Sequence, residues 1–319
     1  MNNSKTSFNG LGIAFISLII ATTLASLPVE AFKDRENYLV YAQDSSLILL
    51  RNLSEGLLST VFNEPLWLLI NIGLGALLEP ENVVRLLIFI SSFVVISRLL
   101  LQDKNKFFLL LFIFFLPIVL KNHIVHLRQG VAIAIFITAY FSLSKYRIFY
   151  LALTPLIHSS FFVILLLMVV GNLMTKTRFA GDLQTVLYFV LGCVLSVMLM
   201  QVAAILGTRQ HEQYTTEVLN NVSGLGFVFW FFILSLYFIQ GKAFLKVHSL
   251  SIGVLLLYLT TYFTLPVTGR IFESAVLIVL LSGTKIKGSL RYVFYSTVII
   301  FSLGQWAMRL NADGLGFYP

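Results

Sequence analysis

Long apolar runs recur along almost the whole chain, and this feature limits the possible folds more than any other. A helix that crosses a bilayer core about 30 Å thick needs roughly 20 predominantly apolar residues. The runs that approach or reach this length are residues 10–28, 82–101, 107–120, 129–143, 183–206, 224–240, 249–265, 268–283 and 292–309. The pattern predicts an all-α polytopic membrane protein with about nine full transmembrane helices.

The composition agrees with this prediction. Of the 319 residues, 58% are hydrophobic and 11% are charged, whereas about 25% of residues are charged in soluble domains. The net charge of +8 comes largely from basic residues in short loops, which the positive-inside rule explains without a nucleic-acid partner. No linker, repeat or low-complexity tract divides the chain, so we expect a single membrane-embedded domain over residues 1–319. The one cysteine, Cys193, excludes an internal disulfide.

Two apolar segments do not fit simple spans. Residues 64–78 form a short run with Asn71 and two glycines, and residues 148–170 form a long run that Pro155 and His158 interrupt. Basic residues are enriched in cytoplasmic loops, and five basic clusters mark such loops: residues 102–106, 144–147, 172–178, 241–246 and 284–291. All five stay cytoplasmic, with the N-terminus, if 64–78 is a short non-crossing outer helix and 148–170 is a re-entrant hairpin turning near His158. This topology puts the C-terminus on the periplasmic side.

The re-entrant hairpin implies a cavity, because non-helical backbone at membrane depth is tolerated only inside protein or beside water. Arg128 lies 17 residues before Lys145, and His158 lies 13 residues after it. At a rise of about 1.5 Å per residue, the two side chains stand roughly 25 Å and 20 Å above this cytoplasmic anchor. We therefore expect Arg128 and His158 to meet in one pocket, below the outer surface of the protein.

Several arginines with few carboxylates nearby lie in the outer half of this topology, and this pattern indicates an anion site. A planar guanidinium group suits a phosphate, which it can hold through two hydrogen bonds. The candidate phosphate-binding residues are Arg35, His126, Arg128, Gln129, Arg209, Tyr214 and Arg270. Structural alternatives stay open, because Arg128 can extend to the membrane interface from a helix end and Arg270 can pair with Glu273 at i, i+3 spacing.

Other motifs have ordinary structural explanations. His123 and His126 have the spacing of a metal-binding pair, but no third ligand lies nearby in the sequence, so we expect no metal. Glu64-Pro65 can be a plain helix start, with proline at the first helical position. Gly130 and Ala134 form a small-xxx-small pair that indicates helix packing. The chain has no Walker loop, dinucleotide fingerprint or nucleophile elbow, so we expect no nucleotide cofactor.

The segment HLRQGVAIAIFITAYFSLSKYRIFYLALTPLIHSSFFVILLL, residues 126–167, resembles the signature of EpsG-type proteins, a branch of the Wzy-like polysaccharide polymerases. In that signature Arg-Gln-Gly opens a small-residue helix, a basic turn follows, and an apolar run ends in His-Ser. Less specific similarity extends over about residues 10–310, in DRENY (34–38), NEPLW (63–67), RQHEQYTTE (209–217) and LPVTGRIFES (265–274). The Arg-x10-Gly loops of some Wzy polymerases are absent after Arg128, Arg209 and Arg270.

The resemblance implies a glycosyltransferase of the bacterial inner membrane that polymerises repeat units into O-antigen, capsule or exopolysaccharide on the periplasmic face. Donor and acceptor would both be oligosaccharides linked to undecaprenyl pyrophosphate, without a cofactor. A flippase and a chain-length regulator of the same pathway would be partners. The acceptor hydroxyl would need a general base, for which His158 is the first choice and Asp34 or Glu64 the second.

Three other functions stay open at this point. The first is another transfer of a glycan from a lipid pyrophosphate. The second is transport of a lipid-linked oligosaccharide, which needs a basic cavity open to both faces and no base beside it. The third is membrane O-acetyl transfer, which needs cytoplasmic access for acetyl-CoA. The polar residues of this topology gather on one side, and this favours the polymerase.

Overall fold

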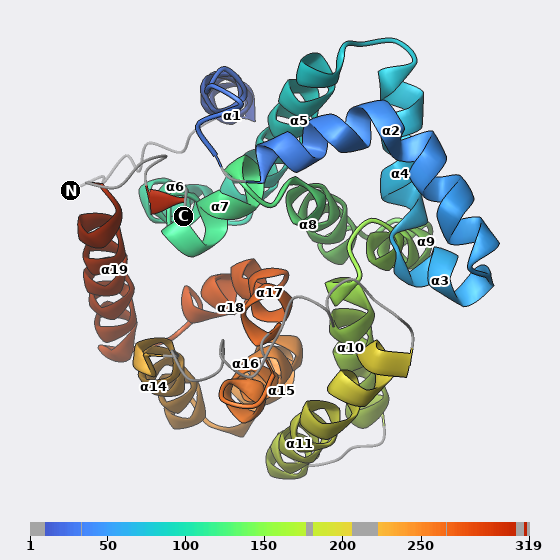
Figure 1. Ribbon diagram of the computed structural model, residues 1–319. Coiled ribbons are helices and arrows are strands. Elements are labelled where there is room, and N and C mark those ends of the chain that lie inside the picture. Colours follow the sequence, from blue (N-terminus) through green and yellow to red (C-terminus); the bar gives the residue numbers. More distant parts are fainter. Residues whose placement is uncertain are drawn as a thin grey trace. The chain divides into compact units, whose positions relative to one another are not determined.

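The computed structural model describes residues 10–32, 34–176, 181–205, 223–265, 267–310 and 316–317, and these ranges contain helices and no strand (Figure 1). The prediction of an all-helical fold is confirmed. The chain forms two compact units: unit 1 holds Met1–Ser159 with Gln305–Pro319, and unit 2 holds Ser160–Gly304. The single membrane domain over residues 1–319 stays a prediction.

The helices of unit 1 are mostly short. They are α1 (Gly10–Ala25), α2 (Arg35–Ser54), α3 (Leu57–Phe62), α4 (Pro65–Gly75), α5 (Pro80–Leu100), α6 (Phe107–Phe114), α7 (Pro117–Ile124), α8 (Leu127–Tyr140) and α9 (Arg147–Leu153), with 3-10 turns η1 (Lys104–Lys106) and η2 (Thr154–Leu156). Three of the α-helices begin with proline as their first residue: α4, α5 and α7. Proline fits this position because its missing N–H would have no partner inside the helix.

Unit 2 contains two long helices and a group of short ones. They are α10 (Ser160–Lys176), α11 (Gly181–Ile205), α14 (Leu225–Ile239), α15 (Lys242–Val247), α16 (Ser249–Thr261), α17 (Thr268–Glu273), α18 (Val276–Gly283) and α19 (Leu290–Arg309). The last residues of α19, from Gln305, belong to unit 1. The segment from α16 to α18, predicted as two spans, consists of three short helices.

By length and apolar composition, two helices in the described part of the chain could cross a membrane: α5 and the Gly181–Met198 part of α11. The number becomes three if Lys104–Phe114 and Pro117–Ile124 together form one span, which bends by 70° before Pro117. The other apolar helices have 10–17 residues. The prediction of about nine full spans is therefore not confirmed, whereas several apolar helices are compatible with a membrane protein.

The two segments singled out from the sequence are both short or broken. The segment 64–78 contains α4, whose 11 residues span about 16 Å, roughly half of a bilayer core. The segment 148–170 is helical on both sides of an interruption at Ile157–Ser159, where the sequence predicts a turn near His158. Whether these two helical stretches form a re-entrant hairpin stays a prediction.

Close helix contacts in unit 1 depend on two glycines. A Cβ added to Gly75 of α4 would lie 2.6 Å from the carbonyl oxygen of Ala42 in α2. A Cβ added to Gly130 of α8 would collide with the carbonyl oxygen of Asn122 in α7. The small-residue contact predicted at Gly130 therefore exists, and it fixes the first turn of α8 against α7.

Candidate functional site

Glu64 stands between two helices in an unusual backbone conformation. It has φ 61° and ψ 56°, and it is the one non-glycine residue with positive φ in the described part of the chain. The left-handed region costs a residue with a Cβ about 1–2 kcal/mol, and a following proline disfavours helical backbone as well. Such strain persists only where the surroundings hold the residue, and it is concentrated at functional sites. Glu64 is therefore the natural centre of a candidate site.

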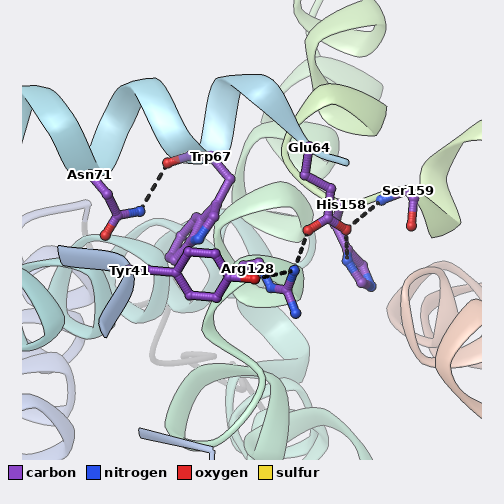
Figure 2. Close-up of polar contacts among 7 residues, drawn as sticks. All are labelled: Tyr41, Glu64, Trp67, Asn71, Arg128, His158 and Ser159. Carbon is purple, nitrogen blue, oxygen red and sulfur yellow. Dashed lines mark hydrogen bonds and ion pairs between the residues drawn. The ribbon is translucent and has the colours of Figure 1, made fainter. Parts of the chain in front are cut away.

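The Glu64 carboxylate is buried and accepts from three groups, as Figure 2 shows. Its Oε2 atom lies 2.5 Å from Nη1 of Arg128. Its Oε1 atom lies 2.9 Å from Nδ1 of His158 and accepts from the backbone N–H of Ser159 at 3.0 Å. One carboxylate thus links an arginine and a histidine that are 30 residues apart in the sequence.

The local fold explains how these groups reach the carboxylate. Arg128 is the second residue of α8, whose start is fixed by the Gly130 contact. His158 follows the turn η2, and the backbone N–H groups of Ile157 and His158 both donate to the Thr154 carbonyl. The chain leaves helical geometry there, so the N–H of Ser159 donates to Glu64 instead of to a helical carbonyl.

Aromatic residues of α2 and α4 surround Arg128. Its Nη1 lies 3.4 Å from the Tyr41 hydroxyl, its guanidinium carbon lies 5.2 Å from the Tyr41 ring centroid, and Tyr38 precedes Tyr41 by about one turn of α2. The buried indole of Trp67 packs edge-on against both tyrosines, at 5.6 and 6.1 Å between ring centroids. Cation–π contact and hydrogen bonds fix the guanidinium orientation. The Arg128 side chain nevertheless keeps 30% of its surface exposed.

The contacts of Glu64 determine its protonation. Burial acts to raise the pKa of the Glu64 carboxyl, but the charge of Arg128, the hydrogen bond and charge of His158 and the Ser159 N–H outweigh burial and lower this pKa to about 2. The carboxylate is therefore ionised near neutral pH and can only accept hydrogen bonds. Nδ1 of His158 must be the donor, which leaves Nε2 as the nitrogen that can take up a proton. Glu64 is thus suited to orient His158 and not to act as the base.

A second histidine–carboxylate pair lies in unit 1. Nε2 of His126 is 3.6 Å from Oδ2 of Asp34, and both side chains are partly exposed. Asp34 lies directly before α2 and His126 directly before α8, the helices that carry Tyr41 and Arg128. Gln129, next to Arg128, is buried. Asp34 remains a candidate base, and His126 and Gln129 remain candidate phosphate ligands.

Arg35 is fully buried among backbone carbonyls. Its Nε donates to the Ile124 oxygen at 2.8 Å, and its Nη1 donates to the oxygens of Leu27 and Pro28 at 3.2 and 2.8 Å. Burial, Arg85 and the opposing effect of Glu30 together lower its pKa to about 10. These contacts join the segment after α1 to the end of α7, so Arg35 has a structural task in addition to the phosphate binding predicted for it.

The remaining predicted site residues lie in unit 2 or outside the described residues. Arg270 and Glu273 belong to α17 of unit 2. Arg209 and Tyr214 lie outside the described residues. No group of three histidine, cysteine or acidic side chains that could hold a metal occurs in the residues that the structure covers. His123 is buried with Nδ1 3.4 Å from the Ser91 hydroxyl, whereas His126 contacts Asp34.

Two features of this site were not predicted from the sequence. The first is the left-handed conformation of Glu64, for which Glu before Pro gives no signal. The second is Tyr41, which is three residues after Tyr38 and therefore shares its helix face; this spacing could have identified it.

The arrangement provides three elements of group-transfer chemistry: a cation that can contact an anion, a histidine with a fixed tautomer, and a carboxylate that holds both. The cation and the histidine are brought together by residues from three separate helical segments. No protein-family model, curated protein or solved structure matches this chain.

Proposed function

We propose that this protein is an inner-membrane glycosyltransferase that polymerises oligosaccharide repeat units carried on undecaprenyl pyrophosphate. The observation that carries the proposal is the Glu64 carboxylate, shared between Arg128 and His158 at 2.5 and 2.9 Å. The resemblance of residues 126–167 to EpsG-type polymerases and the many apolar helices give further support. We assign the reaction to the periplasmic side, in a chain with about nine spans, a re-entrant hairpin at 148–170 and a cytoplasmic N-terminus.

In the proposed reaction, a hydroxyl of the acceptor sugar attacks the anomeric carbon of the donor. The new glycosidic bond forms as the bond between that carbon and the pyrophosphate oxygen breaks. Nε2 of His158 takes the hydroxyl proton, and undecaprenyl pyrophosphate leaves with the bonding electron pair. Glu64 orients the histidine through Nδ1 and stabilises the imidazolium that forms, as a buried carboxylate does in Ser-His-Asp triads.

Arg128 is the proposed contact for the leaving pyrophosphate. Charge on the phosphate oxygens increases as the glycosidic bond breaks, so a fixed guanidinium stabilises the transition state more than the ground state. The contacts with Glu64 and Tyr41 both use Nη1, and the exposed part of the side chain supplies the surface for a phosphate. Arg270, Arg209, His126, Gln129, Arg35 and Tyr214 remain proposed further contacts.

The contact between Glu64 and His158 also distinguishes the proposed polymerase from the alternative functions. A transporter for lipid-linked oligosaccharides would need arginines, but it would gain nothing from a histidine whose tautomer is fixed by a buried carboxylate. An enzyme that transfers a glycan from a lipid pyrophosphate to another acceptor would use the same residues in the same roles. Such an enzyme would differ from the polymerase only in its acceptor. The resemblance of residues 126–167 to EpsG-type polymerases favours a second carrier-linked oligosaccharide as the acceptor.

The test is His158→Ala in a strain that depends on this protein for its polymer. We expect loss of long polymer at a normal level of membrane protein, and accumulation of single repeat units on the lipid carrier or final acceptor. Polymer length is measured on a gel and protein level on a blot. His248→Gln is the matched control, because His248 is a partly buried histidine of unit 2, and it should leave polymer length unchanged. Normal chain length with His158→Ala would contradict the proposal that His158 is the base.

A further inference from the structure

The second half of α2 and the helix α3 form a rigid corner at the surface of unit 1. Gly56, with φ 110°, allows the sharp change of direction between the two helices. The Thr60 hydroxyl lies 3.0 Å from both the Asn52 and the Gly56 carbonyl oxygens, which ties α3 back onto α2. We call residues 44–58 the α2–α3 corner; α2, α3 and α4 are labelled beside one another in Figure 1.

The exposed side of this corner is divided into two edges. The leucine edge consists of side chains that are more than half exposed, Leu47, Leu50, Leu53, Leu57 and Leu58, and the exposed Ser46 and Ser54 lie among them. The charged edge consists of exposed residues at i, i+7 and i+11 spacing: Asp44, Arg51 and Glu55, of which Arg51 and Glu55 pair at 3.9 Å. At 3.6 residues per turn, the two edges of α2 are roughly 120° apart.

Lipid is the partner that fits such a surface. Five exposed leucines within twelve residues are an unfavourable surface in water. The helix α2 is 20 residues long but is not apolar enough to be a candidate span. It packs against α5, which is a candidate span, and α1 of the same unit exposes Leu11 and Phe15. Segregated apolar and charged edges on a helix that does not cross are typical of a helix lying in the membrane interface.

We propose that the α2–α3 corner lies in the interfacial region of the bilayer, with the leucine edge in the acyl chains and the charged edge in water. This anchor would set the depth of the candidate site. The helix α3 ends at Phe62, two residues before Glu64, and the opposite face of α2 carries Tyr41, which contacts Arg128. The Glu64–Arg128–His158 site would then lie near the level of lipid head groups, where a lipid-linked phosphate is found. The proposal on the corner does not depend on which reaction the site performs.

The test uses single cysteines in a Cys193→Ser background, because Cys193 is the only cysteine and is exposed. Nitroxide labels are placed at Leu47, Leu50 and Leu53 on one edge, and at Asp44 and Arg51 on the other. The full chain is reconstituted in nanodiscs of phosphatidylethanolamine and phosphatidylglycerol. Collision of each label with oxygen, which concentrates in lipid, is compared with collision with a water-soluble nickel chelate. All five positions are exposed, so the labels do not disturb the core.

We expect at least a severalfold higher ratio of oxygen to nickel collisions at each leucine position than at Asp44 and Arg51. Equal access of nickel to both edges would overturn the proposal, because the corner would then be in water. Protection of the leucine edge from both reagents would also overturn it, because a protein surface would then cover the leucines. A continuous change of depth from Asp44 to Leu53, without alternation between edges, would mean that α2 crosses the membrane. Each result is obtained whether or not the chain makes polymer, so it is separate from the test of His158.

Discussion

The two units bury different kinds of polar group. Unit 1 buries ionisable side chains, namely Glu64, Arg35, His123 and His158. Unit 2 buries mainly hydroxyl and amide groups, and Glu273 is the one buried carboxylate among its described residues. A buried charge needs close partners and restricts the backbone around it, whereas a hydroxyl is satisfied by one neighbour. We therefore expect the residues of the proposed reaction to be concentrated in unit 1, whereas contacts between helices dominate the described part of unit 2.

The seam between α11 and α16 illustrates the packing of unit 2. On α11 the facing residues recur every four positions, at Gln184, Tyr188, Gly192 and Ser196. Gln184 and Tyr188 both contact the Ser249 hydroxyl, at 2.5 and 2.8 Å, and Ser196 contacts Thr264 at 2.6 Å. Small residues and paired hydroxyls allow close helix approach in lipid.

Polar atoms without a partner show the same contrast. The buried side-chain atoms of unit 1 that lack a hydrogen bond include Trp67 Nε1, Asn71 Oδ1, Asn122 Oδ1 and His123 Nε2. Such atoms are rare in proteins and cost stability. They lie on α4 and α7, which carry or support Glu64 and Arg128. These unpaired atoms lower the stability of the region around the candidate site in unit 1.

The largest effect is expected from Glu64→Gln, which keeps the size of the side chain and removes its charge. Arg128 and His158 then lose their common ion-pair partner, and the histidine tautomer is no longer fixed. We expect polymer synthesis to fall by about 10³–10⁴-fold, as when a buried carboxylate that orients a catalytic histidine is neutralised. Incorporation of labelled sugar by purified membranes measures the rate.

The matched control is Glu81→Gln. Glu81 pairs with Arg85 at 2.6 Å, and its side chain is half exposed, so its loss should cost at most about 1 kcal/mol of stability and no activity. If the Glu64→Gln variant makes polymer at the same rate as the Glu81→Gln variant, the Glu64 carboxylate takes no part in the reaction. The proposed contrast between the two units would then be wrong.

The second effect concerns Arg128→Lys. Lysine keeps the charge but offers no planar fork for a phosphate. We expect a loss of about 2–4 kcal/mol of transition-state stabilisation, or roughly 30–1,000-fold in rate, with normal protein level. The measurement is polymer length on a gel beside membrane protein on a blot.

Arg270→Lys in unit 2 is the comparison variant, and we expect the same kind of loss to a smaller degree. Wild-type chain length from Arg128→Lys would mean that the arginine serves only as an anchor at a helix end. A larger loss from Arg270→Lys than from Arg128→Lys would move the centre of the chemistry to unit 2.

Much of unit 1 could be predicted from the sequence, and the reasons are local. Proline at the start of α4, arginine at the start of α8 and the interruption near His158 follow from backbone preferences of nearby residues. The rise per residue also predicts that Arg128 and His158 meet, and both do contact Glu64. These elements depend on few long-range contacts.

What could not be predicted depends on contacts between distant residues. The Glu64 carboxylate pairs with groups 64 and 94 residues away, and such contacts are what can hold a residue in a left-handed backbone conformation. The nine full spans are not confirmed, because hydropathy does not show where apolar helices break, as between Thr261 and Thr268 or before Pro117. An apolar run predicts that a segment lies in an apolar environment, but it does not predict where the helix in that segment begins and ends.

The third prediction concerns pH. The pKa of Glu64 is lowered from 4.5 to about 2 in the folded protein. A lowered carboxyl pKa stabilises the fold fully above the unfolded pKa, and this contribution is lost as pH falls from about 4.5 towards 2. The loss amounts to roughly 3 kcal/mol. Hydrogen exchange of the detergent-solubilised protein should show unit 1 opening in this pH range, in peptides covering residues 64–75, before peptides covering residues 184–196 of unit 2.

Glu64→Gln is the control for the pH effect, because glutamine does not titrate. The variant should lose the acid-dependent opening of residues 64–75 and keep any change that other carboxyl groups cause. Equal sensitivity of both regions in the wild type would show that one cooperative unit unfolds, and the contrast between the units would not extend to stability.

The smallest effect is expected from Tyr188→Phe in unit 2. The Tyr188 hydroxyl lies 2.8 Å from Ser249 Oγ and donates to the Leu167 carbonyl at 3.3 Å, and the ring packs against Gly253, where an added Cβ would lie 2.8 Å from ring carbon Cε1. Phenylalanine keeps the ring packed against Gly253 and removes only the hydroxyl, which should lower the free energy of unfolding by about 1 kcal/mol. We expect Tm to fall by about 2–4 °C with normal polymer length, and Tyr292→Phe, at an exposed tyrosine, to change neither. Loss of polymer from Tyr188→Phe at normal protein level would show that the contact between α11 and α16 serves activity as well as packing, which would contradict the contrast between this region and the Glu64 site.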